Sequence, residues 1–245
     1  TTKENPRTPT LMCGIVGVWN RRTGENVNQA MLTDMRNALR HRGPDDAGLF
    51  VDGPIGLGHQ RLAILDLSAR GHQPMEAPNG RYAITFNGEI YNYRELRSRL
   101  ASAGVVFRSQ SDTEVLLSLL AAYGPAILKD LRGMFAFGFW DREREELLLA
   151  RDPFGKKPLY YADEDGVFLF ASEPKALLRH PNVSRDIDPA ALTKYFLYEY
   201  VPSPGTAYRA VRQIPPGSYA IVTKTDMQIR QRWAPVFLPK HAKAT

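Results

Sequence analysis

The apolar residues of this chain fall into two patterns: short continuous runs, and longer stretches with helical spacing. Residues 12–19 are mostly apolar and rich in β-branched side chains, which predicts a buried strand. Strands at 48–52 and 55–65, separated by Gly53-Pro54, are predicted to form a hairpin. By the same reasoning we expect further strands at 82–86, 134–140, 146–150, 159–161, 167–171, 218–223 and 228–233.

Helical spacing of apolar residues predicts helices at 28–40, 111–122, 173–178 and 189–198, and one that begins after residue 92. Asn28 is a candidate N-cap. Asn92 with Glu95, and Ser111 with Glu114, have the spacing of a capping box. Strands and helices each occur in runs and do not alternate one by one. We therefore predict an α+β fold, with mostly antiparallel sheets and helices packed on their outer faces.

The composition indicates one globular domain, or one domain followed by a linker, with 245 residues of which 43% are hydrophobic and 24% charged. The net charge is +6, but the basic residues are scattered, which favours a solvated surface over a nucleic-acid partner. No stretch approaches the roughly 20 apolar residues that cross a bilayer. The first twelve residues lack the apolar segment of a secretory signal. We therefore expect a cytoplasmic protein without a membrane or nucleic-acid partner.

Cys13 is the only cysteine, so a disulfide within the chain is excluded. It follows Met12 at the head of a predicted strand. If Met12 were removed as an initiator, Cys13 would carry a free α-amine, which titrates near ~7.7–8.0 and could accept the proton of its own thiol. One residue would then supply both nucleophile and base. The alternative is a cysteine that only packs in a core strand.

Asn87 and Gly88 follow another predicted strand, and a capped helix is expected almost at once after them. Attack on a carboxamide produces an oxyanion, which needs preorganised hydrogen-bond donors. The side-chain amide of Asn87 and the unobstructed backbone N–H of Gly88 are suitable donors. The alternative is a hairpin turn, for which Asn-Gly is a common sequence.

Arg61 and Asp112 are candidates for binding an amino-acid substrate. Arg61 lies on an otherwise apolar strand, and its guanidinium suits a carboxylate held through two hydrogen bonds. Asp112, at a predicted helix start, could bind an ammonium group. The alternatives are a structural salt bridge for Arg61 and a favourable helix-dipole position for Asp112.

Eight sequence blocks stand out in order along the chain: MCGI (12–15), RHRGPD (40–45), RLAIL (61–65), FNGEIYN (86–92), SDTE (111–114), GMFAF (133–137), RDPFG (151–155) and ASEPKAL (171–177). In this order and spacing they resemble the class II glutamine amidotransferase domain, and most of all the N-terminal half of glutamine-dependent asparagine synthetases. The resemblance extends from residue 12 to about residue 233, nearly the whole chain.

The resemblance implies an N-terminal-nucleophile (Ntn) hydrolase fold, a four-layer αββα sandwich of two mostly antiparallel sheets. It also implies that Cys13 is the nucleophile, with its freed amine as the base, and that Asn87 and Gly88 form the oxyanion hole. Arg61 and Asp112 would hold the substrate L-glutamine. The remaining substrate-binding residues that it implies are Leu62, Ala63, Ile64, Leu65 and Glu89, together with Asn87 and Gly88.

The resemblance divides the chain into an extension, propeptide or tag at 1–12, a glutaminase domain at 13–233, and the start of an interdomain linker at 234–245. We favour a start at Met12, because a methionine directly before the nucleophile is the simplest origin. No metal or cofactor is expected in the glutaminase half. ATP and Mg²⁺ are expected only in a synthetase domain, whose Ser-Gly-Gly-x-Asp-Ser loop is absent from this sequence. The implied partners are L-glutamine and that C-terminal domain, and a homodimer is possible.

Two other functions stay open on the sequence. The domain could supply ammonia to a different acceptor, such as a sugar phosphate, phosphoribosyl pyrophosphate or another carboxylic acid. It could also be a non-catalytic binding or regulatory domain, if the amine of Cys13 is never freed.

Overall fold

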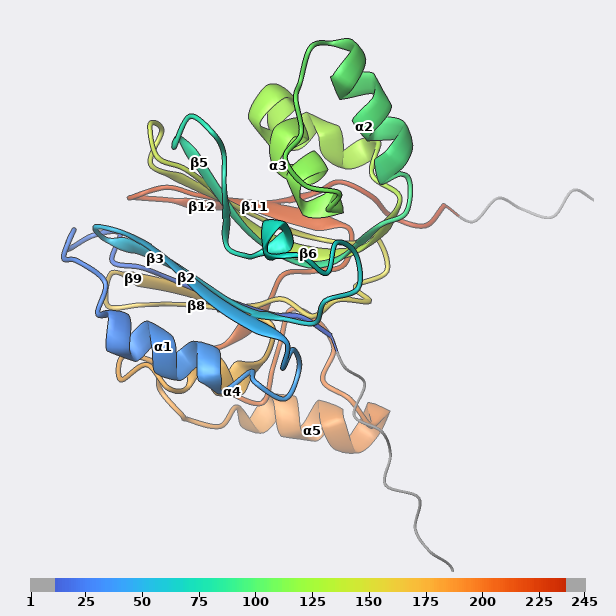
Figure 1. The fold of residues 1–245 in the computed structure, drawn as a ribbon. Coiled ribbons are helices and arrows are strands. Elements are labelled where there is room, and N and C mark those ends of the chain that lie inside the picture. The colour runs from blue at the N-terminus through green and yellow to red at the C-terminus, as the bar shows by residue number, and fades with distance from the viewer. Residues whose placement is uncertain (1–11, 237–245) are drawn as a thin grey trace, which may run out of the picture.

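Two antiparallel sheets lie face to face, with helices on both outer sides (Figure 1). The computed structural model describes residues 12–236. In spatial order, the first sheet consists of β10 (Arg212–Gln213), β8 (Tyr160–Glu164), β9 (Val167–Ala171), β1 (Gly14–Trp19), β3 (Ile55–Arg61) and β2 (Asp46–Asp52). The second consists of β12 (Met227–Gln231), β11 (Ser218–Val222), β7 (Glu146–Arg151), β6 (Gly133–Asp141), β5 (Tyr82–Ile90) and β4 (Met75–Glu76).

The helices form the two outer layers (Figure 1). Those on the side of the first sheet are α1 (Gln29–Asn37), α4 (Pro174–Leu177) and α5 (Pro189–Tyr198). Those on the side of the second sheet are α2 (Tyr93–Ser102) and α3 (Asp112–Tyr123). Two short 3₁₀ turns, at Ala69–Gly71 and Gly124–Lys129, complete the elements. The predicted α+β fold, with αββα layers, is confirmed.

Apolar residues pack in three layers because neighbouring residues of a strand point to opposite faces. Ile15 of β1 packs in the layer between the sheets, and the adjacent Val16 packs against α1. In the second sheet, Ala136 points into the layer between the sheets, whereas Phe137 contacts the core beneath α3. This alternation explains how both faces of each sheet are covered.

Two strand boundaries differ from the sequence prediction, and both differences shape the cavity described below. β3 ends at Arg61 and does not continue to residue 65. The N–H of Leu62 turns to the sulfur of Cys13, and that of Ala63 donates to Asp45, so neither continues the ladder. β5 does not stop at residue 86 but continues to Ile90, paired with β6 throughout.

Of the helix N-caps predicted at Asn28 and Asn92, the first is confirmed and the second is wrong. Asn28 caps α1 by accepting from the N–H of Met31, as expected. The capping box at Asn92 is wrong, because its side-chain amide instead accepts from Arg132 N and donates to Asp130 O. The amide thus joins two loops and leaves the helix uncapped.

Only one of the two hydrogen bonds of the predicted capping box forms at the start of α3. Ser111 accepts from Thr113 N, as an N-cap should. The carboxylate of Glu114 reaches further back, to the N–H groups of Arg108 and Ser109, and so holds the preceding loop against the helix.

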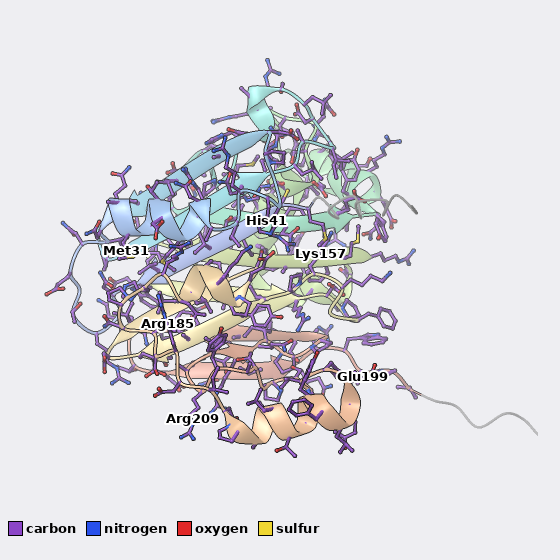
Figure 2. The ribbon with its side chains drawn as sticks, turned by 90° about the horizontal axis from the view of Figure 1, so that it is seen from below. Met31, His41, Lys157, Arg185, Glu199 and Arg209 are labelled. Atoms are coloured by element: carbon purple, nitrogen blue, oxygen red, sulfur yellow. The ribbon has the colours of Figure 1, made fainter. Side chains whose placement is uncertain are left out.

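The helix α5 is apolar but lies almost entirely exposed on the outside of the molecule, at the bottom of Figure 2 with Glu199 at its end. Ala191 is its one buried residue, whereas Phe196 is 82% exposed and Leu197 69% exposed. A helix that is apolar on most sides is normally covered. Among the described residues, nothing covers this surface.

The assignment of residues 1–12 to an extension and of 234–245 to a linker stays a prediction, since 1–11 and 237–245 lie outside the described residues. None of the described helices is long and apolar enough to cross a bilayer.

Candidate active site

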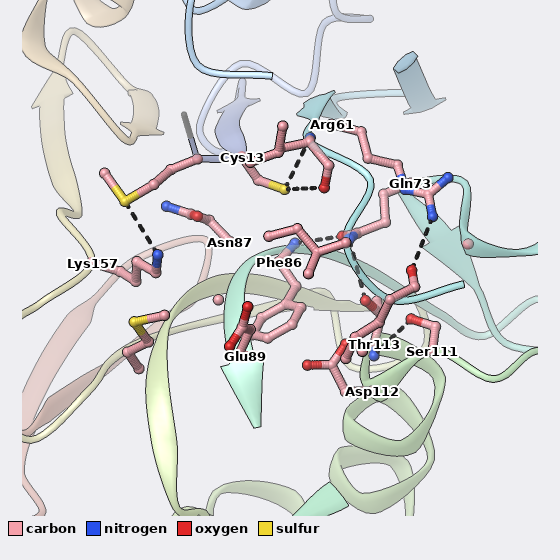
Figure 3. A pocket seen from close by; sticks show the side chains of 17 residues that line it. Cys13, Arg61, Gln73, Phe86, Asn87, Glu89, Ser111, Asp112, Thr113 and Lys157 are labelled. Atoms are coloured by element: carbon pink, nitrogen blue, oxygen red, sulfur yellow. Dashed lines mark hydrogen bonds between the residues drawn. The ribbon is translucent and has the colours of Figure 1, made fainter. Parts of the chain in front are cut away.

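A cavity of about 310 Å³ lies where β1 begins and β5 ends, so that both sheets contribute to its walls (Figure 3). Most of the residues singled out from the sequence line it: Cys13, Arg61, Leu62, Ile64, Leu65, Asn87, Gly88, Glu89 and Asp112. Ala63 is the exception and is not among the lining residues. The fold therefore gathers side chains that are up to 99 positions apart in the sequence, as between Cys13 and Asp112.

Cys13 lies directly before β1, with its thiol against the backbone of the loop that follows β3. The sulfur accepts from the N–H of Leu62 at 3.4 Å and lies 3.6 Å from the Leu62 carbonyl oxygen. Burial raises the pKa of the thiol, and the Leu62 hydrogen bond and the charges of Lys157 and Arg61 only partly oppose this. The thiol is therefore protonated at neutral pH and would need a base in order to act as a nucleophile.

Arg42 holds the backbone of Cys13 in place. Its Nε donates to the Cys13 carbonyl at 3.0 Å, and its own carbonyl accepts from Met12 N at 2.8 Å. Glu173 orients the guanidinium through a hydrogen bond of 2.8 Å to Nη1. The sequence showed Arg42 within a family block, but nothing there indicated this contact.

Asn87 projects its side chain from β5 toward the first sheet. Thr85, two residues earlier, points the same way and donates to the Gly58 carbonyl of β3. The Asn87 side chain lines the cavity beside Cys13 (Figure 3). Its Nδ2 is buried and has no hydrogen-bond partner among the described residues. A buried amide donor without an acceptor is rare and suggests that a ligand supplies one.

The backbone of β5 presents a row of N–H groups along the edge that faces away from β6. Phe86 N donates to Gln73 at 2.7 Å and Ile90 N donates to Asp112 at 3.0 Å. Gly88 N lies between them on the same edge, since alternate residues of a strand share an edge. The hairpin-turn alternative for Asn87-Gly88 is wrong, because both residues lie within β5.

Gly88 is required by the close approach of β6. A Cβ at this position would lie 2.2 Å from the Met134 carbonyl oxygen, well below a van der Waals contact. The absence of a side chain therefore keeps β5 and β6 in register at the mouth of the cavity.

Asp112 begins α3 and is 5% exposed. Burial raises its pKa to about 6, although the hydrogen bonds from Ile90 N and Thr113 N work in the opposite direction. A favourable helix-dipole position accounts for part of its environment. That alternative does not explain why the carboxylate also borders the cavity.

Arg61 lines the cavity but does not meet a carboxylate within the described part of the chain. Its guanidinium donates to the carbonyls of Ser68, Leu65 and Asp66. The structural salt bridge considered from the sequence is therefore wrong. The contacts show that Arg61 orders the loop at 65–68, of which Leu65 lines the cavity.

Two further residues that line the cavity, Gln73 and Lys157, were not singled out from the sequence. Gln73 links the elements around the cavity, because its Oε1 accepts from Phe86 N and its Nε2 donates to Thr113 at 3.2 Å. Lys157 places its ammonium 3.2 Å from the sulfur of Met12. No cluster of three or more potential metal-binding side chains occurs in the described residues.

Known proteins share sequence and fold with this chain. The family model described as "Glutamine amidotransferase domain" matches residues 12–234. The chain is 43% identical over 209 residues to asparagine synthetase [glutamine-hydrolyzing] 1 of Bacillus subtilis, covering 84% of this chain and 33% of that protein. It is 39% identical over 168 residues to asparagine synthetase B of Escherichia coli, covering 68% of this chain and 30% of that protein. The chain thus spans about a third of these relatives.

Among solved structures, the chain resembles glutamine phosphoribosylpyrophosphate amidotransferase from Bacillus subtilis, with a TM-score of 0.67. The match covers 91% of this chain and 50% of that one, at 23% sequence identity. At this identity the likeness concerns the fold, and it supports the predicted Ntn-hydrolase type.

Proposed function

Because the chain belongs to the glutamine amidotransferase domain family, we propose that it hydrolyses L-glutamine to glutamate and ammonia with Cys13 as nucleophile. The observation that carries the proposal is the buried, unpartnered amide nitrogen of Asn87 in the same cavity as the Cys13 thiol. The cavity of about 310 Å³ is large enough for one amino acid.

The reaction begins with a proton transfer within Cys13. While Met12 is attached, the nitrogen of Cys13 belongs to an amide and cannot act as a base. Once the Met12–Cys13 bond is cleaved, the free amine accepts the thiol proton and leaves a thiolate. The burial that raises the thiol pKa makes this internal base necessary.

The thiolate then attacks the carboxamide carbon of glutamine. The oxygen becomes an oxyanion that accepts from Asn87 Nδ2 and Gly88 N, donors already in place before the substrate binds. Collapse of this intermediate breaks the C–N bond, and ammonia leaves with the proton held by the Cys13 amine. Water next attacks the γ-glutamyl thioester, which releases glutamate and restores the thiol.

The substrate's own charges are bound by other residues that line the cavity. Asp112, in its ionised form, and Glu89 bind the α-ammonium, and Arg61 with the loop of residues 62–65 binds the α-carboxylate. Arg61 already lines the cavity with its guanidinium ordered by three carbonyls, so it loses little conformational freedom on binding.

We assign no metal or cofactor to this hydrolysis. The ammonia is used to amidate aspartate in a C-terminal synthetase domain that consumes ATP and Mg²⁺, a partner suggested by the names and the greater length of the relatives. Glutamine-dependent formation of asparagine by the full-length gene product tests this acceptor. Release of ammonia without asparagine would refute aspartate as the acceptor.

Sedimentation velocity tests the homodimer, which requires a species of twice 27.6 kDa.

The hydrolysis itself is tested on protein whose intact mass shows Cys13 as the first residue. We expect glutamate and ammonia in equal amounts, and no turnover by Cys13→Ala, with the melting temperature nearly unchanged. Undiminished turnover by that variant would refute the assignment of the nucleophile. Full activity of protein that still carries Met12 would refute the role of the amine.

A further inference from the structure

Lys157 is a buried cation that contacts the side chain of Met12, the residue joined to Cys13. It is 6% exposed, and its Nζ contacts the sulfur of Met12 at 3.2 Å (Figure 3). It forms no ion pair within 4 Å in the described part of the chain. A thioether is a weak acceptor, so this contact compensates little for burying an ammonium group.

The position of Lys157 is rigidly set by the turn between β7 and β8. The carboxylate of Asp152, 1% exposed, accepts from the N–H groups of Lys157, Lys156 and Phe154 and from Phe135 N. The Lys157 carbonyl accepts from Arg151 Nε at 2.9 Å. With its backbone held at both ends, Lys157 has a fixed origin from which its side chain reaches the cavity.

Met12 is the residue that must leave before Cys13 can react. Its removal deletes the sulfur that Lys157 contacts and creates an amine at the position where Met12 was joined. The Lys157 ammonium then lines the same cavity as the new amine and the thiol, and its charge already acts on that thiol. A like charge nearby disfavours protonation of an amine.

We propose that the ammonium of Lys157 keeps the freed amine of Cys13 in its neutral, proton-accepting form at physiological pH. Lys157 is thus a positioning residue whose charge acts through Cys13, and this inference rests on the function proposed above. Without the charge, the amine would hold a proton and could not take one from the thiol.

The other charged groups around Cys13 do not replace Lys157. The charge of Arg42 is paired with the carboxylate of Glu173, and the charge of Arg61 acts on the Cys13 thiol less strongly than that of Lys157. The negative charges of Asp112 and Glu89 act on the pKa values of their neighbours in the opposite direction to the cations. The carboxylate of Asp152 already accepts hydrogen bonds from backbone N–H groups. The positive charge of Lys157 in turn lowers the pKa of the Cys13 thiol, although burial outweighs it.

The test is the pH dependence of glutamine hydrolysis by protein that begins at Cys13. We expect Lys157→Met to shift the acid limb of kcat/KM to higher pH by about 1 unit or more, with activity recovering above that limb. Lys157→Arg, which keeps the charge, should restore the midpoint. Lys156→Met removes the exposed neighbouring lysine and should leave the limb unchanged.

A second readout does not require turnover. The chain contains one cysteine, so alkylation by iodoacetamide reports Cys13 alone. The alkylation rate of Lys157→Met should rise at a pH higher than that of the parent protein. Melting curves confirm that each variant is folded.

The outcomes separate the two proposals. A lower rate with an unmoved acid limb and an unmoved alkylation profile would show that Lys157 is only structural. If the parent protein lacks glutaminase activity, or if Cys13→Ala retains it, the proposed function itself fails. A shift that Lys157→Arg does not reverse would also overturn the inference, because the charge would not be its cause.

Discussion

Asn87 carries a buried side-chain amide that lines the cavity without a hydrogen-bond partner among the described residues. Its Nδ2 is inaccessible to solvent and has no acceptor among the described residues. Leaving such a donor unpaired costs about 1–3 kcal/mol. In the proposed reaction this cost is relieved when the oxyanion forms beside Asn87, so the unpaired donor of the free protein stabilises the transition state.

We expect Asn87→Ala to lower kcat by roughly 10²–10³-fold, the usual loss for one oxyanion donor. Steady-state kinetics with glutamine would measure it. Asn37→Ala, at an exposed asparagine of α1, is the matched control and should have no effect. A loss confined to KM would mean that Asn87 binds the ground state only.

Asp112 should make stability and substrate binding respond to pH in opposite directions. Its folded pKa of about 6 lies above its usual value of 3.8, so the folded protein holds this proton more tightly than the unfolded chain. Its contribution to stability is therefore present below pH 4 and lost as pH rises through 6. Binding of the substrate ammonium needs the ionised form, so KM for glutamine should fall over that same range.

Asp112→Asn removes the cost of a buried charge. We expect it to raise stability at pH 7.5 by on the order of 2 kcal/mol, with no gain at pH 4, and to raise KM for glutamine at least tenfold. Urea unfolding at both pH values and steady-state kinetics would measure these effects. Equal stability of the variant and the parent at pH 7.5 would contradict the raised pKa.

At the scale of elements, the helix α5 contributes apolar surface but little packing. Phe196→Ser should change the free energy of unfolding by less than about 0.5 kcal/mol, because the side chain contacts little in this fold. Leu119→Ala, in the fully buried part of α3, should cost about 2–5 kcal/mol. Chemical denaturation would compare them. A large loss for Phe196→Ser would show that α5 is packed in solution.

Element boundaries also show where local sequence information was insufficient. The pattern at 82–86 correctly predicted a strand, and the Asn-Gly pair after it resembled a turn. Register with β6 overrode that local preference, because pairing continues through Gly88 and Phe135 to Ile90. The N-cap of α1 was predictable because it depends only on Asn28 and an N–H three residues away.

At the scale of the whole molecule, Phe170 of β9 ties the two sheets together. A Cβ at Gly17 of β1 would lie 2.0 Å from its ring, and one at Gly138 of β6 would lie 2.4 Å from it. The ring therefore fills the space that glycines leave in both sheets. The distance between the sheets depends on this complementarity.

We expect Phe170→Ala to cost about 3–5 kcal/mol of stability and Gly138→Ala about 1–3 kcal/mol. In a Phe170→Leu background, the smaller side chain should reduce the cost of Gly138→Ala. A double-mutant cycle in chemical denaturation would measure this coupling. Additivity within about 0.5 kcal/mol would show that the ring and the glycine do not compete for space.

Local chemistry could be predicted from the residues themselves. Hydrophobic periodicity predicted most strands and helices and the α+β class, because side-chain direction alternates with a period that each element imposes. The single cysteine, Asn87 with Gly88, Arg61 and Asp112 were identified from residue type and motif, and the structure brings them to one cavity.

Long-range packing decided the rest. Pairing with β6 determines the edge of β5 from which the Gly88 N–H points. The end of β3 at Arg61 determines which carbonyls the guanidinium contacts. Lys157 lies 145 positions from Met12, and no local pattern links them. Contacts of this kind depend on how two sheets are stacked, and that arrangement is a property of the folded chain as a whole.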